Sequence, residues 1–190
     1  MRELDTRKRT GVLIFTKSEN IFAKIIRFIE GPQCSHMAGI YFDTFKNDYC
    51  VAEMKFGGWW FWRKGGLVST EVEKWFKKNG ENVVAVAYPT GNTREISHRL
   101  NVVISADVRE GKGYDIGGLF GFLHQKFRKL NDPELYFCSE YWATRLKEQG
   151  LDIARKSKEA LESPQDLMKL IGGITLEEVA INPYLRYKVT

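Results

Sequence analysis

One cysteine in the sequence stands where a protein can make a thiol reactive. Cys138 opens the stretch 138–149, whose apolar and polar residues separate onto two faces at the spacing of an α-helix. Gly150 then takes the place of a left-handed C-terminal residue, and Leu151 can close a Schellman motif with Leu146. Free backbone N–H groups and the helix dipole lower the pKa of a thiol at a helix N-terminus. Cys138 is therefore a candidate nucleophile, although its position alone does not distinguish it from a packing residue.

A cysteine nucleophile needs a base to take its proton, and usually a third group to orient that base. The chain has three histidines. His98 and His124 lie on the polar sides of predicted helices, which is typical of solvated surface residues. His36 instead opens the strand-like run HMAGIYF after the loop GPQCS, where an imidazole can face a helix N-terminus. His36 is the candidate base, and a structural histidine is the alternative.

A carboxylate stands in the middle of the strand-like run CVAEMKF. Such a group must either face water or have a partner. If Glu53 points outward from the sheet, it faces water. If it points toward the neighbouring strand, it accepts the second ring N–H of His36, fixes the tautomer and stabilises the imidazolium. The residues alone leave both interpretations open.

The other two cysteines suggest a different chemistry. Cys34 and His36 would share one face of a strand, with Cys50 near them across the expected hairpin, as in a zinc site. The chain lacks a Cys-x-x-Cys pair and an evident fourth ligand, so we expect no metal and no other cofactor. Without a signal peptide, the cysteines are expected to be reduced, and a Cys34–Cys50 disulfide is the one exception that the hairpin allows.

The elements that must position these residues follow from the hydrophobic periodicity. The runs GVLIF (11–15), HMAGIYF, YCVAEMKF and NVVAVAY (82–88) have the pattern of strands, and the polar turn 43–48 joins the middle two as a hairpin. Helices are predicted over 20–31, 92–108, 114–130, 138–149 and 164–171. Strands first and helices afterwards predict an α+β domain, in which a small, mostly antiparallel sheet packs against a helical layer.

Consecutive aromatic residues lie in the segment GGWWFWRKGG (57–66). Strand alternation sends Trp59 to one face and Trp60 and Trp62 to the other, so they cannot all enter one core. A hairpin that is buried on both sides accounts for them. An aromatic wall or lid beside the site, which stacks on sugars or acyl chains, accounts for these aromatic residues equally well. We expect Trp59, Trp60, Trp62 and Tyr141 to bind substrate.

The composition is that of an ordinary globular chain. With 190 residues, 43% hydrophobic and 28% charged, we expect one domain over 1–190. No apolar run is long enough for a transmembrane segment, and the N-terminal residues lack an apolar signal region, so we expect a cytoplasmic protein. The net charge of +5 comes from scattered residues, with only RKR (7–9) and KFRK (126–129) clustered, which predicts no specific nucleic-acid partner.

Several motifs, in their order, resemble a known family. SHMAGIYF, VAEM, GYDIGGLFGF, FCSEYWATRLKEQG and SPQDL follow one another as in the circularly permuted branch of the NlpC-type papain-like cysteine hydrolases, the YiiX-like group. In that branch the histidine strand precedes the cysteine helix. The resemblance covers a core of about residues 10–172. It implies a permuted papain-like fold, with Cys138 as nucleophile, His36 as general base and Glu53 as the residue that orients the base. The segment 57–66 departs from the family pattern.

The resemblance implies a cysteine peptidase or amidase that cleaves its substrate through an acyl-enzyme on Cys138. The backbone N–H of Cys138 would be one donor to the oxyanion. One alternative is a lipid acylhydrolase or acyltransferase of the lecithin:retinol acyltransferase-like kind, which the tryptophan-rich segment favours. Another is a binding module that keeps the fold without turnover, which the intact Cys, His and Glu set argues against. The expected partner is a peptide, amide or acyl-bearing substrate.

Overall fold

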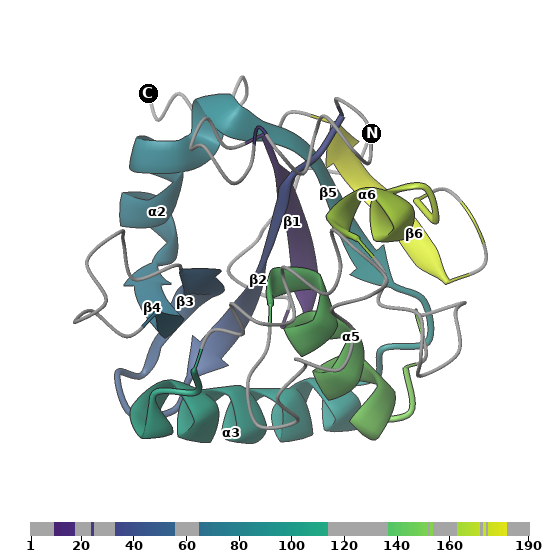
Figure 1. Cartoon of the computed structure of the whole chain (residues 1–190). Coiled ribbons are helices and arrows are strands. Elements are labelled where there is room, and N and C mark those ends of the chain that lie inside the picture. Colours follow the sequence, from purple (N-terminus) through teal and green to yellow (C-terminus); the bar gives the residue numbers. More distant parts are fainter. Residues whose placement is uncertain are drawn as a thin grey trace, which may run out of the picture.

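A computed structural model describes residues 10–17, 24, 33–55, 65–113, 137–151, 153, 163–171, 173 and 175–181. These residues include a six-stranded sheet in the order β4-β3-β2-β1-β5-β6, in which all neighbouring strands are antiparallel (Figure 1). The strands are β1 (Val12–Thr16), β2 (His36–Asp43), β3 (Asp48–Lys55), β4 (Gly66–Glu71), β5 (Val83–Pro89) and β6 (Leu176–Ile181). The helices are α2 (Val72–Asn79), α3 (Arg94–Glu110), α5 (Cys138–Glu148) and α6 (Pro164–Met168), with a short 3-10 helix η2 (Gly80–Asn82).

Helices cover both faces of the sheet. On one face, α3, α5 and α6 bury apolar residues against the strands, and Figure 1 shows α5 crossing in front of the sheet while α3 runs along its lower end. On the other face, α2 buries apolar residues in a second cluster. The α2 residues of this second cluster are Val72, Trp75 and Phe76. The α+β class is confirmed, and the sheet lies between two layers rather than against one.

The β2–β3 hairpin predicted from the sequence is present, and its register decides which side chains share a face. Asp43 Oδ1 accepts the backbone N–H groups of Phe45 and Lys46 at 3.0 and 3.1 Å, which closes the turn. Ala38 then lies opposite Glu53 in the ladder. Side chains alternate along a strand, so Glu53 and His36 both fall on the face of Ala38. That is the face covered by α2.

Helix α5 starts at Cys138 and ends in the predicted Schellman motif. The Leu151 N–H donates to the Leu146 carbonyl at 2.9 Å, and the Gly150 N–H donates to the Lys147 carbonyl at 2.9 Å. Gly150 has a left-handed φ of 85°, which glycine adopts without steric cost. The C-terminal end of the helix is therefore defined by the sequence around it.

Two sets of contacts hold α5 in place. Asp107 of α3 accepts from the Arg145 side chain at 2.7 Å and from the Tyr141 hydroxyl at 2.9 Å, and both bonds are buried. On the sheet side, the Trp142 indole packs over Gly39 of β2, where a Cβ atom would lie only 2.5 Å from the nearest ring carbon. Glycine at this position lets α5, and with it Cys138, approach β2 closely.

The remaining elements agree only in part with the sequence predictions. The helices predicted over 92–108 and 164–171 are present as α3 and α6, and Ser163 caps α6 by accepting the N–H of Asp166 at 3.1 Å. Strands β4 and β6 and helix α2 were not predicted. The helix predicted over 114–130 and the aromatic residues 59–62 lie outside the described residues, as does the helix over 20–31 apart from Lys24.

Candidate active site

Three elements bring the predicted catalytic residues into one group. His36 is the first residue of β2, Glu53 lies near the end of β3, and Cys138 begins α5. The Nε2 atom of His36 lies 3.2 Å from Oε2 of Glu53. The side chains of His36 and Cys138 lie close enough for each to shift the pKa of the other. With Nε2 facing the carboxylate, Nδ1 is the ring nitrogen left for the sulfur.

The group is mostly buried and reaches solvent through the imidazole. Cys138 is 4% exposed and Glu53 is 5% exposed, whereas the side chain of His36 is 20% exposed. Glu53 therefore does not face water, and the interpretation of it as an outward-facing residue is wrong. Its burial requires a charged or hydrogen-bonding partner, which His36 supplies.

The Cys138 and His36 side chains shift each other's pKa. Burial disfavours the thiolate of Cys138, but the charge and hydrogen bond of His36 outweigh burial and lower the Cys138 pKa. Backbone hydrogen bonds from Met37 and Ser139 lower it further. Burial also opposes the imidazolium of His36, yet the charge and hydrogen bond of Cys138, followed by those of Glu53, raise the His36 pKa to about 10. Each of the two groups therefore stabilises the charged form of the other.

The Glu53 carboxylate is ionised and fully engaged. Burial opposes its charge, but the hydrogen bond and charge of His36 and then those of Lys55 lower its pKa to about 2. The second carboxylate oxygen, Oε1, accepts from the Trp75 indole N–H at 2.8 Å and lies 2.7 Å from Lys55 Nζ. Sequence reasoning missed both residues, although a tryptophan buried on one face of a helix needs a partner for its N–H.

The other two cysteines differ from Cys138. Burial raises the pKa of Cys34 to about 12, and its thiol donates to the His36 carbonyl at 3.3 Å. Burial also raises the pKa of Cys50. All three cysteines are free thiols in the structure. Cys50 pairs with Tyr41, which lies about 17 Å along β2 from His36 by the rise of a strand.

This spacing removes the alternatives that need Cys50 near the candidate site. A Cys34–Cys50 disulfide would need their Cα atoms within about 7 Å of each other, which the β2–β3 register excludes. A zinc site built from Cys34, His36 and Cys50 is excluded for the same reason. Within the part of the chain that the structure describes, no group of three or more His, Cys, Asp or Glu side chains is placed to hold a metal ion.

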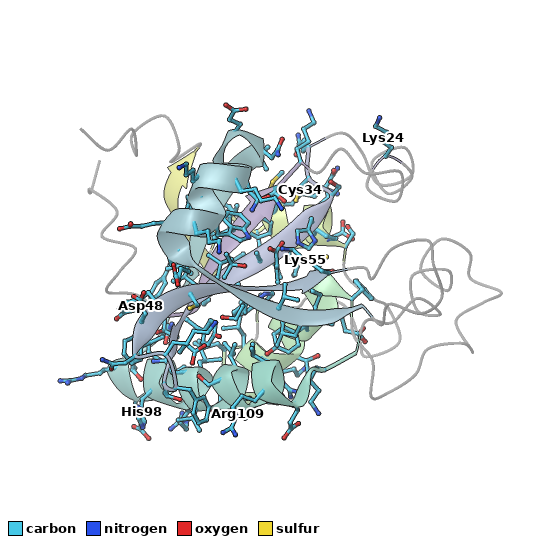
Figure 2. The ribbon with its side chains drawn as sticks, turned by 90° about the vertical axis from the view of Figure 1, so that its left-hand side faces the viewer. Lys24, Cys34, Asp48, Lys55, His98 and Arg109 are labelled. Atoms are coloured by element: carbon cyan, nitrogen blue, oxygen red, sulfur yellow. The ribbon has the colours of Figure 1, made fainter. Side chains whose placement is uncertain are left out.

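Of the other candidates from the sequence, His98 lies apart from this group, because it is exposed and points outward from α3 (Figure 2). Cys34 lies beside the group, since its thiol donates to the His36 carbonyl, and so does Lys55, which pairs with Glu53. His124, Trp59, Trp60 and Trp62 lie outside the described residues. The Tyr141 side chain is fully buried and bonded to Asp107, so in this structure it packs α5 against α3 and presents no surface to a substrate.

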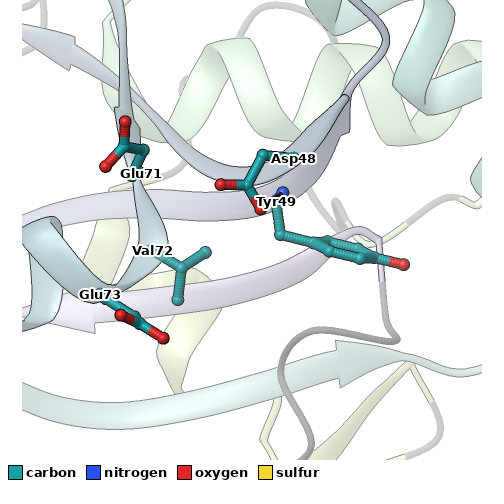
Figure 3. Close-up of a pocket in the computed structure, with 5 residues that line it drawn as sticks. All are labelled: Asp48, Tyr49, Glu71, Val72 and Glu73. Carbon is teal, nitrogen blue, oxygen red and sulfur yellow. Dashed lines mark hydrogen bonds between the residues drawn. The ribbon is translucent and has the colours of Figure 1, made fainter. Parts of the chain in front are cut away.

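A separate hollow lies at the opposite end of β3. Asp48, Tyr49, Glu71, Val72 and Glu73 line it, from the start of β3 and the junction of β4 with α2 (Figure 3). Figure 2 shows Asp48 and Lys55 at the two ends of the strand. The hollow contains none of the three predicted catalytic residues, and we do not include it in the candidate site.

A comparison with solved structures identifies the fold. No protein-family model matches the chain, and no curated protein matches its sequence. The crystal structure of the metalloprotein YiiX from Escherichia coli O157:H7, of the DUF1105 group, does match, with a TM-score of 0.62 and 18% sequence identity. The match covers 92% of this chain and 98% of YiiX. The chain therefore has the fold of YiiX, as the order of its sequence motifs predicted. As a separate finding, none of the described helices is long and apolar enough to cross a membrane.

Proposed function

We propose that the protein is a cysteine hydrolase that cleaves an amide or peptide bond through an acyl-enzyme on Cys138. One observation carries this proposal: the thiol of Cys138 begins a helix and its pKa is lowered by a histidine that a buried carboxylate holds. Nucleophile, base and orienting acid are the parts that covalent acyl transfer requires. A packing cysteine needs neither a lowered pKa nor an imidazole beside it.

The acylation half of the reaction uses the thiolate and the imidazolium. The Cys138 sulfur attacks the substrate carbonyl carbon, a C–S bond forms, and the carbonyl electron pair moves onto oxygen. The backbone N–H of Cys138, in the first turn of α5, lacks an acceptor within its helix and donates to this oxyanion. His36 then gives its proton to the leaving nitrogen as the C–N bond breaks. The amine departs, and the acyl group remains on Cys138 as a thioester.

Deacylation reverses the roles. Neutral His36 takes a proton from a water molecule, whose oxygen attacks the thioester carbonyl. The C–S bond breaks, the carboxylic acid leaves, and the thiolate and imidazolium are restored. In both halves of the reaction, Glu53 accepts the Nε2–H of His36 and stabilises the imidazolium whenever it forms. Glu53 itself makes and breaks no covalent bond.

The proposal is tested by pulses of iodoacetamide over a pH series, followed by peptide mapping of the three cysteines. We expect Cys138 to react fastest at about pH 6, because iodoacetamide consumes thiolate and only this thiol has a lowered pKa. Cys34 and Cys50 are buried with raised pKa values and should react slowly. If either of them reacts first, or if Cys138 is inert below about pH 8, the hydrolase proposal fails and the binding module takes its place.

Acyl transfer is measured separately with a small activated ester, p-nitrophenyl acetate. Wild-type protein should gain one acetyl group on Cys138, detectable by mass spectrometry, and then release acetate as the thioester hydrolyses. Cys138→Ser should lose this turnover, while Cys50→Ser, which changes a buried thiol far along the sheet from His36, should retain it. A panel of peptides, simple amides and long-chain esters then separates a peptidase or amidase from a lipid acylhydrolase.

A further inference from the structure

The Glu53 carboxylate divides its two oxygens between two sets of donors. Oε2 meets the His36 ring at 3.2 Å. Oε1 accepts from the Trp75 indole N–H at 2.8 Å and lies 2.7 Å from Lys55 Nζ. The carboxylate is buried, so its orientation depends on these partners rather than on water. The donors on Oε1 therefore decide which oxygen is left for His36.

The two donors on Oε1 differ in how firmly they are placed. Trp75 is 1% exposed, lies in the cluster between α2 and the sheet, and meets the Phe76 ring edge-on at 5.2 Å. The indole N–H is uncharged and does not titrate, and the packing of the ring fixes the direction in which it points. The Lys55 side chain is 45% exposed, so salt screens its charge and its stem can change rotamer. Trp75 is therefore the donor with a fixed direction.

We propose that Trp75 is a positioning residue of the active site, which holds Glu53 so that Oε2 faces His36 and the His36 ring faces Cys138. This inference rests on the hydrolase function proposed above. It gives α2, on the face of the sheet opposite α5, a part in preparing the nucleophile. A packing role for Trp75 would require burial of the ring but no directed bond to an ionised carboxylate.

The charges around the carboxylate set the expected direction of the effect. His36 faces it from β2 and Lys55 from β3, and Cys138 of α5 lies beyond the imidazole. Strand β4 places apolar Val68 opposite Glu53. If the carboxylate turns away from His36, the imidazolium loses stabilisation, and the thiolate that depends on it becomes harder to form. The pH at which Cys138 becomes reactive should then rise.

The test compares the pH dependence of Cys138 alkylation by iodoacetamide in Trp75→Phe and wild-type protein. Trp75→Phe keeps an aromatic ring in the cluster and removes the N–H. The acidic limb of this profile is the pH range over which the alkylation rate rises. We expect it to move to higher pH by up to about one unit, the scale of one hydrogen bond to a charged group. Glu53→Gln should move it at least as far. Val72→Ala, which reduces the packing of α2 and keeps both the Trp75–Phe76 ring contact and the donor to Glu53, should leave the limb in place.

The outcomes separate this inference from the proposed function. If wild-type Cys138 shows no acidic limb, the hydrolase proposal fails and the inference fails with it. If wild-type protein shows the limb and Glu53→Gln moves it, but Trp75→Phe does not, the inference alone is overturned. An equal shift in Trp75→Phe and Val72→Ala also overturns it, because the packing of α2 would then account for the effect.

A measurement with Trp75 in place keeps the inference testable if Trp75→Phe does not fold. In ¹⁵N-labelled protein, an indole N–H that donates to a carboxylate resonates downfield of one that donates to a neutral amide. We expect one tryptophan indole resonance to move upfield in Glu53→Gln while the others stay unchanged. Unchanged indole resonances in that variant would overturn the inference.

Discussion

Replacing Gly39 by alanine should push α5 away from β2. A Cβ atom at this position would lie 2.5, 2.6 and 2.7 Å from three carbons of the Trp142 indole. Carbon atoms in favourable contact are about 3.5–4.0 Å apart, so the overlap is about 1 Å. Trp142 is fully buried, and its ring has no space to swing into solvent. The strain is relieved only if the helix and the strand separate.

The same separation acts on both stability and chemistry. Overpacking of this kind costs about 1–3 kcal/mol of unfolding free energy. Gly39 lies three residues after His36 on β2, and Trp142 lies four residues, about one turn, after Cys138 on α5. Moving the helix off the strand therefore lengthens the distance between sulfur and imidazole. A misplacement of about 1 Å can cost on the order of a hundredfold in rate.

Urea unfolding and the rate of Cys138 alkylation at about pH 6 measure the two effects. We expect Gly39→Ala to lose stability and to react more slowly than wild type. Trp142→Phe removes the overlapping indole carbons, so the double variant should recover part of both losses in a double-mutant cycle. Gly150→Ala is the matched control, because its φ of 85° strains an alanine while no other atom lies within 4 Å.

The control variant should lose about 1–2 kcal/mol and keep the wild-type alkylation rate. The reasoning is refuted if Gly39→Ala matches wild type in both measurements. It is also refuted if the losses from Gly39→Ala and Trp142→Phe simply add, since the two side chains would then not be in conflict.

Two further predictions concern stability. Asp107→Asn should lower the unfolding free energy by about 1–3 kcal/mol, measured in urea, because it removes the charged partner 2.7 Å from Arg145 Nε while Glu148 still pairs with the guanidinium. The lowered pKa of Glu53 adds stability that is present above its ordinary pKa of 4.5 and is lost as the pH falls toward about 2. The stability difference between wild type and Glu53→Gln should therefore shrink by a few kcal/mol over that range, and a constant difference would contradict the linkage with His36.

The candidate site could be predicted because its residues carry local signals. Cys138 stands at the start of an amphipathic helix, His36 at the start of a strand, and Glu53 inside an apolar strand where a charge needs a partner. The order of the motifs along the chain predicted the permuted fold. None of these signals depends on knowing which strands pair beyond the β2–β3 hairpin.

The missed elements lack such signals. Strand β4 runs directly into α2 at Glu71–Val72 without a glycine or proline between them, so nothing in the sequence separates the two. Strand β6, LEEVAI, contains residues that favour helices, and its pairing with β5 overrides that preference. Trp75 lies 22 residues from Glu53, and only the packing of α2 on the sheet brings the two together.

The sheet lies between α5, which begins at Cys138, and α2, whose Trp75 contacts Glu53. Residues of α2 reach the carboxylate from the face opposite the reacting sulfur. Substitutions in α2 would change the pKa of the Cys138 thiol and would not contact the acyl group of a substrate. For the hydrolase proposed above, a library confined to α2 would therefore select for the working pH, whereas a library around the start of α5 would select for the substrate.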